Sequence, residues 1–301
     1  MALNSQRASS RIIFESPDIR FGLWECPPES RLWSIENTIG PAPVIALPWT
    51  AVVIDRNNKS RSLMDPNSVA YYSPNELYKR QLASNKGDLC GFISPSLPLL
   101  ATILGEAGLD VTNDAPPFKV GPAVSWATAA HHKLAKSITD NTPPPDLVIE
   151  SVLMEIARET ILKAASESRR KPRQYRSIST SRAHADIARR TKEVMARSVS
   201  DTDAEQIRLE DISKQVHVST YHLCRVFKQQ TGESIAQHHL RLRLRAAAGR
   251  LAWSDHTITS IAHDFGFANH AHFTTAWKSE FGYPPSALRR TSHCFYDRAR
   301  N

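Results

Sequence analysis

One segment near the C-terminal end carries side chains suited to reading a nucleic acid. Arg225 follows Ser219 by six positions in a helical pattern. A guanidinium can donate two hydrogen bonds to O6 and N7 of a single guanine. Leu223 and Phe227 occupy the opposite face of the expected helix, which leaves Arg225 for a base or for solvent. The full set of candidates in this helix is Ser219, Thr220, Tyr221, Arg225 and Lys228.

Several of these residues also have simple structural roles. Ser219 is suited to cap the helix, with a phosphate contact as a second role. Tyr221 could contact a thymine methyl group or the DNA backbone, or it could pack at the helix start. Lys228 could lie along its own domain surface rather than on a polyanion. Arg225 is the candidate with the most specific chemistry.

A second segment has the same layout with weaker chemistry. Its candidates are Asn269, His270, Thr274, Thr275 and Lys278. Asn269 is a cap, whereas the histidine and threonine side chains cannot form a bidentate fork on guanine. His270 and His272 are two positions apart, so on a helix they point about 200° from each other and do not form a metal site. We expect the two segments to read DNA unequally.

The two segments are copies of one unit, which indicates an internal duplication. Ile212–Ser219 matches Ile261–Asn269, and the apolar positions after the turn recur 50 residues later. Each copy reads as a short helix, a tight turn and a second helix, the pattern of a helix-turn-helix. We therefore predict helix-turn-helix units at 209–230 and 258–281.

A connecting helix is predicted between the copies. Ser234 and Gln237 form a capping box, and apolar positions continue to Trp253. About twenty residues at 1.5 Å each give a rod of about 30 Å. Successive major-groove faces of B-DNA lie about 34 Å apart, so one chain could place both second helices on adjacent turns.

These ordered motifs resemble the DNA-binding domain of AraC/XylS-type transcription regulators. The matching patterns are S-x-x-x-L-x-R-x-F-K-x-x-x-G at 219–232, I-x-x-I-A-x-x-x-G-F at 258–267 and F-G-x-x-P-x-x-x-R at 281–289. The resemblance covers about a third of the chain. It implies an activator that recruits RNA polymerase. The N-terminal part resembles the small cupin-type sensor domain of such regulators through Asp65-Pro66-Asn67 and Gly87-Asp88-Leu89-Cys90.

The sequence departs from the family pattern at three positions. His217 stands where glycine is common, which would strain the first turn if the residue needs a positive φ. Trp277 replaces a phenylalanine as a bulkier core residue. Thr275 stands where arginine is frequent, which weakens base reading by the second unit.

Charge divides the chain in two. Residues 169–301 hold 23 Lys and Arg against 12 Asp and Glu, a net charge of +11, whereas residues 1–168 carry −3. The basic half suits a polyanion, although a solubility bias would look similar. We predict a domain at 1–168, a basic linker at 169–182, a DNA-binding domain at 183–291 and a tail at 292–301.

The first domain reads as β-structure followed by helices. Short β-type runs at 44–47, 50–54 and 69–72 are separated by expected turns at 57–59, 65–67 and 73–75. This spacing predicts a β-roll or barrel, so the fold class is α+β with an all-α C-terminal domain. Apolar residues recur with helical spacing at 147–164, where a helix could pack on the β-roll or form a homodimer seam.

Other classes of function are disfavoured. No histidine precedes His131, so a His-ligated metal site in the β-roll is excluded, and any ligand there is held by hydrogen bonds and apolar contacts. No nucleophile-elbow context occurs, and the four cysteines show no CxxC pair, which fits a reduced, cytoplasmic chain without cofactor. The sequence has no run of eighteen apolar residues, so we expect no transmembrane helix. It also shows no apolar leader, so we expect no secretory signal.

The sequence thus predicts a non-enzymatic, sequence-specific regulator that binds double-stranded DNA. Its other expected partners are RNA polymerase, a small-molecule effector and a second copy of the chain. Two rival classes are a ligand-independent architectural DNA binder and a DNA-acting enzyme with a helix-turn-helix tail. The first would not respond to metabolites, and the second would need a nucleophile or metal cluster.

Overall fold

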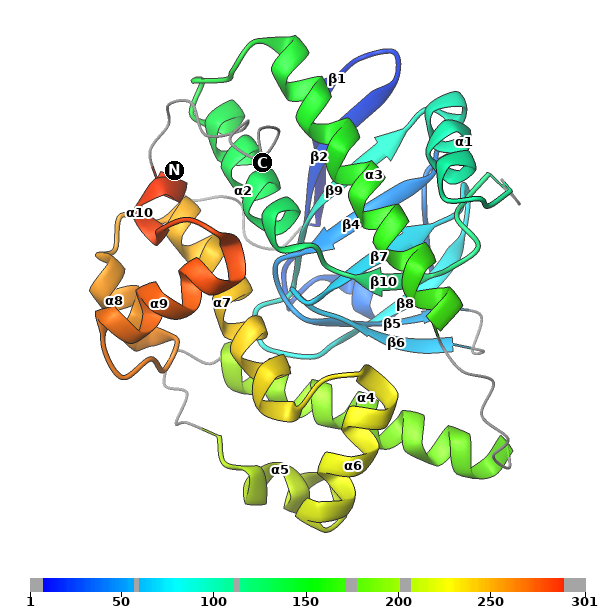
Figure 1. Ribbon diagram of the computed structural model, residues 1–301. Helices are drawn as coiled ribbons and strands as arrows, with labels where there is room; N and C mark the ends of the chain where they lie inside the picture. The colour runs from blue at the N-terminus through cyan, green and yellow to red at the C-terminus, as the bar shows by residue number, and fades with distance from the viewer. Residues whose placement is uncertain (1–7, 57–59, 111–113, 171–177, 201–206, 290–301) are drawn as a thin grey trace.

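Two antiparallel sheets form the N-terminal half of the protein. A computed structural model describes residues 8–56, 60–110, 114–170, 178–200 and 207–289 (Figure 1). The six-stranded sheet has the order β1-β2-β9-β4-β7-β10, and the four-stranded sheet has the order β3-β8-β5-β6. The strands are β1 (Ser9–Glu15), β2 (Ile19–Cys26), β3 (Asn37–Thr38), β4 (Val44–Pro48), β5 (Val52–Arg56), β6 (Ser60–Met64), β7 (Ser68–Tyr72), β8 (Leu77–Leu82), β9 (Asp88–Pro95) and β10 (Val120–Pro122).

Each sheet has one face toward an internal cavity and one face toward packed helices, because successive side chains of a strand point to opposite sides. In β9, Asp88, Cys90 and Phe92 line a cavity between the sheets, whereas Ile93 is buried in the core beneath the helices. In β5, Val52 and Ile54 line the cavity and Val53 faces outward. The predicted runs at 44–47, 50–54 and 69–72 are therefore strands of a two-sheet roll, which confirms the predicted β-roll.

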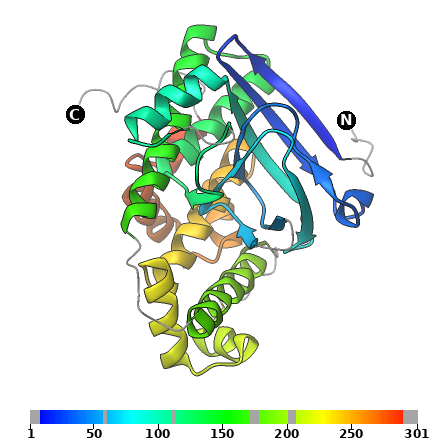
Figure 2. The same cartoon turned by 90° about the vertical axis from the view of Figure 1, so that its right-hand side faces the viewer.

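Three helices pack on the outer face of the six-stranded sheet (Figures 1 and 2). They are α1 (Leu97–Glu106), α2 (Ser125–Thr139) and α3 (Asp146–Arg170). The apolar residues of the predicted 147–164 helix, Ile149, Val152, Leu153 and Ile156, are buried in the same core as Ile45 and Ile93. This stripe of α3 packs on its own domain rather than on a second chain.

The C-terminal half is helical, as predicted. Its helices are α4 (Ile178–Ser200), α5 (Leu209–Val216), α6 (Thr220–Thr231), α7 (Ile235–Trp253), α8 (Ile258–Asp264), α9 (His270–Phe281) and α10 (Pro285–Arg289). The pairs α5–α6 and α8–α9 are the two helix-turn-helix units, and α7 runs between them (Figure 1). Both predicted units are present.

The two halves share hydrophobic cores. Val53 and Leu63, on the outer face of the four-stranded sheet, pack with Met195 of α4 and with residues of α5 and α6. Ala129 of α2 belongs to the core of the second unit with Trp277. Each helix-turn-helix unit is therefore in contact with the N-terminal half.

Helices occupy both ends of the segment that was predicted to be a linker. Helix α3 continues to Arg170 and α4 begins at Ile178, so helix extends into both ends of the predicted 169–182 segment. The turn at 57–59, the middle of the linker at 171–177 and the tail at 292–301 lie outside the described residues. Within the described part of the chain, no helix is long and apolar enough to cross a membrane.

Candidate nucleic-acid interface

The first helix-turn-helix unit is built from local turn and cap chemistry. Helix α5 ends at Val216, and the next residue, His217, has φ 61° and ψ 47° in the left-handed region. The condition named in the sequence analysis, a positive φ at this non-glycine residue, is therefore met. Two residues later the Ser219 hydroxyl accepts a hydrogen bond at 3.3 Å from the backbone N–H of His222, which caps α6. The unit closes at Gly232 with φ 81°.

Helix α6 buries one face and exposes the face that carries the candidates. The buried face of α6 consists of Leu223, Val226 and Phe227. Arg225 is exposed, and its Nη2 lies 3.5 Å from Nδ1 of His222. The remaining candidates are Ser219 and Lys228, which are exposed, Thr220, which is half-buried, and Tyr221, whose side chain is 78% exposed. An aromatic ring so exposed is available to a partner.

The second unit repeats this construction with a different turn. Gly266 has φ 70°, and Arg243 of α7 donates hydrogen bonds to the carbonyls of Phe265 (2.7 Å) and Gly266 (2.9 Å). The Arg243 guanidinium also lies 4.2 Å from the centre of the Phe267 ring. Asn269 then caps α9 by accepting a hydrogen bond at 2.8 Å from the backbone N–H of His272. The sequence motifs did not indicate this role of Arg243.

Helix α9 exposes most of its candidates. His270, Thr275 and Lys278 are exposed, as is the cap Asn269. Thr274 is half-buried, but its hydroxyl is buried and has no hydrogen-bond partner within the part of the chain that the structure describes. Trp277 is fully buried between Phe273 and Phe281, at ring separations of 5.5 and 4.2 Å. The exposed face of α9 therefore offers shorter and less charged side chains than that of α6.

Helix α7 sets the spacing of the two units. Its 19 residues correspond to about 28 Å, close to the predicted rod. The predicted capping box is present, because Ser234 accepts from the backbone of Gln237 at 3.2 Å and the Gln237 side chain accepts from Ser234 N at 3.1 Å. The candidate faces of α6 and α9 thus lie at opposite ends of the continuous helix α7.

Comparison with known proteins matches this region. A family model described as a helix-turn-helix domain matches residues 212–291. The HTH-type transcriptional activator RhaS of Salmonella arizonae is 36% identical over 92 residues, which is 31% of this chain and 33% of RhaS. Residues 212–291 match a helix-turn-helix domain, and we call them the AraC-type domain below because of the family that their sequence motifs resemble. The chain thus spans about a third of the length of the curated relatives that it matches.

Solved structures resemble the AraC-type domain or a larger part of the chain. An AraC-type transcriptional regulator from Chromobacterium violaceum is 26% identical, with a TM-score of 0.32, and the match covers 35% of this chain and 90% of that one. Apo ToxT from Vibrio cholerae is 12% identical, with a TM-score of 0.38, over 92% of this chain and 99% of that one.

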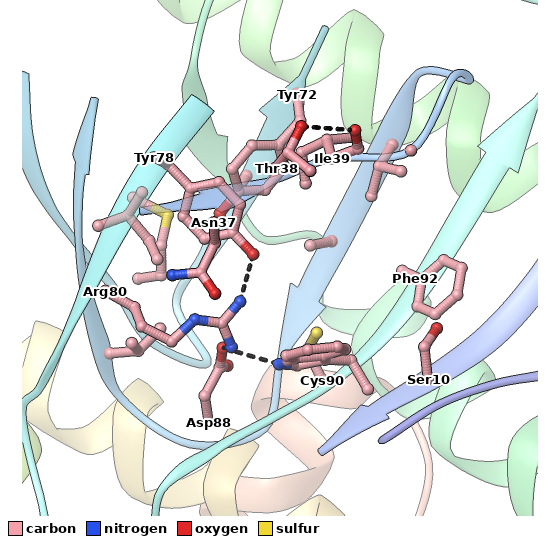
Figure 3. A pocket seen from close by; sticks show the side chains of 18 of the residues that line it. Ser10, Asn37, Thr38, Ile39, Tyr72, Tyr78, Arg80, Asp88, Cys90 and Phe92 are labelled. Atoms are coloured by element: carbon pink, nitrogen blue, oxygen red, sulfur yellow. Dashed lines mark hydrogen bonds and ion pairs between the residues drawn. The ribbon is translucent and has the colours of Figure 1, made fainter. Parts of the chain in front are cut away.

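The N-terminal half contains a cavity between the two sheets. Its volume is about 590 Å³, within the usual range for small-molecule sites. The walls are mostly apolar, and Figure 3 shows Ile39, Tyr72, Tyr78 and Phe92 around the space. The strands that supply these residues belong to both sheets, so the cavity is the interior of the roll.

One end of the cavity is polar and charged. Arg80 is 1% exposed, donates to Asp88 Oδ2 at 2.9 Å and also contacts the Tyr78 hydroxyl (Figure 3). Trp24 Nε1 donates to the same Asp88 oxygen at 3.0 Å. Burial raises the pKa of Asp88 although Arg80 opposes this shift, and burial raises the pKa of Tyr78 to about 12. The Arg80 Nε–H is buried and has no hydrogen-bond partner among the described residues.

The cavity contains no histidine among its lining residues. Across the described residues, no group of three or more His, Cys, Asp and Glu side chains is arranged to hold a metal ion. Cys90 lines the cavity, and burial raises its pKa well above that of a free thiol, so it is held in the protonated form. The groups that could hold a ligand are therefore hydrogen-bonding side chains and apolar walls.

Proposed function

We propose that this protein is a sequence-specific, DNA-binding transcription regulator. The observation that carries the proposal is the pair of exposed helix faces, on α6 and α9, at the two ends of one 19-residue helix within an AraC-type domain. The contact residues we propose are Ser219, Thr220, Tyr221, Arg225, Lys228, Asn269, His270, Thr274, Thr275 and Lys278.

The two faces are proposed to differ in role. Arg225 discriminates guanine, which is worth about 1–3 kcal/mol for a bidentate pair. Asn269 and Lys278 of the second unit hold the DNA backbone, and Thr275 adds little base selectivity. The half-site read by α6 therefore has a stronger base preference than the half-site read by α9.

Binding-site selection with the full-length protein tests this proposal. We expect a site with one strongly specified half and one loosely specified half, one helical turn apart. Affinity should fall about 10³- to 10⁵-fold between 50 and 200 mM salt if 6–10 phosphates are contacted. No enrichment of any duplex at low salt would rule out the proposed function.

Paired variants test the roles of the two helices. Arg225→Ala should relax the base preference of the strong half by about tenfold or more. The control is Thr275→Ala, which changes an exposed residue of α9, the helix of the second unit that corresponds to α6. It should change the base preference by less than about threefold. A larger loss from Thr275→Ala would show that α9 is the main reading helix.

A second proposal concerns the cavity, which we assign to a small-molecule effector. Its largely apolar walls and one polar end suit an apolar molecule with a single hydrogen-bonding group placed against Arg80, Asp88 and Asn37. The buried, unpartnered Nε–H of Arg80 supports a ligand acceptor at that end.

The effector proposal is tested by measuring DNA affinity with and without a cell metabolite extract. Ala46 is 8% exposed and lines the cavity, so Ala46→Leu fills part of it. The extract should change the DNA affinity of the unmodified protein and leave that of Ala46→Leu unchanged. An equal response in both proteins would place the effector elsewhere, and no response in either would favour the architectural binder.

We further propose that the regulator is an activator in the cytoplasm that contacts RNA polymerase. The name of RhaS as a transcriptional activator supports the sign of regulation. Transcription in vitro from a template with the selected site should rise on addition of the protein, and repression would reverse the assignment. Light scattering of the protein, alone and on DNA, tests the proposed homodimer.

A further inference from the structure

The turn between β6 and β7 contacts the AraC-type domain through the polar side chain of Asn67. This turn is tightly held. Asp65 Oδ1 accepts from the backbone N–H of Asn67 at 2.9 Å, and the Ser68 hydroxyl donates to Asp65 O at 2.8 Å. The Asn67 carbonyl accepts from Ala123 N at 2.9 Å. The backbone of Asn67 is therefore fixed by its own domain.

The side chain of Asn67 makes its hydrogen bonds in the other domain. Its Nδ2 donates to the carbonyl of His238 at 3.1 Å and lies 3.4 Å from Nε2 of the same histidine. Its Oδ1 accepts from Arg245 Nη1 at 3.1 Å. Both ends of one amide are thus paired with α7.

The two α7 residues lead to different helix-turn-helix units. His238 Nδ1 donates to Glu233 Oε1 at 2.7 Å, and Glu233 directly follows Gly232 at the end of the first unit. Arg245 Nη2 lies 2.8 Å from Oε1 of Glu280, in the last turn of α9 in the second unit. His238 and Arg245 are seven residues apart, which puts them on the same side of α7 about 10 Å from each other.

Burial makes these links costly to break. Arg245 and His238 are 6% and 3% exposed. A buried charge that loses its partner is strongly unfavourable, so Arg245 and Glu280 are expected to move together. Ser125 of α2 adds a second contact from the N-terminal half, because its hydroxyl donates to Glu280 Oε1 at 2.8 Å and accepts from Arg245 Nη2 at 3.2 Å.

We propose that Asn67 is a positioning residue for DNA binding, which fixes the first and second helix-turn-helix units relative to each other from the N-terminal domain. This inference rests on the proposed function. Asn67 does not touch the exposed faces of α6 or α9. It acts through His238 and Glu233 on one unit and through Arg245 and Glu280 on the other. The N-terminal domain thereby sets which spacing of half-sites the protein accepts.

The test compares full-length protein and variants on three duplexes derived from the selected site. One duplex holds both half-sites at the selected spacing, one has two base pairs inserted between them, and one holds only the half-site read by α6. The unmodified protein should prefer the selected spacing. Asn67→Ala should reduce this preference by about tenfold, with unchanged affinity for the single half-site.

Two further variants separate positioning from general damage. Asn67→Asp keeps an acceptor for Arg245 but loses the donor to His238, so it should reduce the spacing preference less than Asn67→Ala. Ser125→Ala removes a contact on the Glu280 side only and should also reduce the preference. Thermal melting of each variant confirms that it is folded.

The outcomes are distinct. An unchanged spacing preference in Asn67→Ala and Ser125→Ala overturns the inference. Equal losses on all three duplexes also overturn it, because that result indicates a structural role alone. Failure of the unmodified protein to bind any duplex instead refutes the proposed function.

Discussion

Acidification from pH 7 to pH 5 is expected to destabilise the fold through the buried histidines of α2. His131 is 1% exposed, and burial lowers its pKa to about 4 although a hydrogen bond to the Ala127 carbonyl opposes the shift. Trp49 Nε1 donates to His131 Nε2 at 2.7 Å, so a second proton on the ring would face another donor. Burial and the charge of His131 hold the pKa of His132 well below its usual value.

The sign and size of the effect follow from the difference between the folded and unfolded states. An unfolded histidine has a pKa of about 6.5, so between pH 6.5 and pH 4 the unfolded chain binds the extra proton. The free energy of unfolding is therefore fully maintained above pH 6.5 and falls as pH falls. With 1.36 kcal/mol per pKa unit, His131 alone accounts for a loss of about 2 kcal/mol between pH 7 and pH 5.

Glu76 and Asp88 do not add to this loss between pH 7 and pH 5. Burial favours the neutral form of Glu76, but the hydrogen bonds from Lys119 and from the Ser73 backbone outweigh it and lower the pKa. Its stabilising effect is therefore lost only as pH falls below the unfolded value of about 4.5. Burial raises the pKa of Asp88, so the folded protein takes up this proton more readily than the unfolded chain, and Asp88 opposes the loss as pH falls. A variant of His131 therefore separates the histidine contribution from that of the carboxylates.

Urea unfolding at pH 7, 6 and 5 measures this loss. His131→Gln retains an acceptor for Trp49 but does not titrate, so its free energy of unfolding should fall by about 2 kcal/mol less than that of the unmodified protein over this range. His270→Gln, at an exposed position of α9, is the control and should follow the unmodified protein. Equal pH slopes for His131→Gln and the unmodified protein would refute the reasoning.

Four local substitutions test single backbone and side-chain features through the free energy of unfolding. His217→Gly should raise the free energy of unfolding by up to about 1 kcal/mol. Left-handed backbone costs a non-glycine residue about 1–2 kcal/mol, and the greater conformational entropy of glycine in the unfolded chain offsets part of the gain. A lower free energy of unfolding in chemical denaturation would contradict this. Ser219→Ala and Ser234→Ala should each lower it by about 1 kcal/mol through loss of a helix cap, and only Ser219→Ala should also weaken DNA binding in a retention assay. Tyr71→Phe removes a buried hydrogen bond of 2.9 Å to the Thr160 carbonyl and should cost about 1–3 kcal/mol by urea unfolding, and no loss would show that the carbonyl finds another partner.

The helix-turn-helix units could be predicted because their features are local. Ser219, Asn269 and Ser234 cap helices within three residues of the N–H groups that they bind. The positive φ of His217 follows from its place in a tight turn. The short β-type runs separated by turn residues likewise indicated a β-roll or barrel from short windows of sequence.

The contacts between domains could not be predicted from such windows. Asn67 and Arg245 are 178 positions apart, and a turn pattern does not indicate which helix receives the side chain. Arg241, Arg243 and Arg245 alternate with leucines along α7, so residue type alone did not indicate that Arg245 is the buried one. The pairing of Arg80 with Asp88 in the cavity was hidden for the same reason, because each residue alone reads as an ordinary strand position.

The outer face of the four-stranded sheet, where Val53 and Leu63 pack on α4, has a consequence for how the chain is made. Residues before 171 leave the ribosome first, so this apolar face remains exposed to solvent until α4 has been synthesised. At about 5–20 residues per second the delay is a few seconds. Release of the chain before Met195 would leave the face open to other chains. Truncated forms that end near the linker are therefore expected to aggregate, and refolding of the roll and the first helix-turn-helix unit should occur as one cooperative transition.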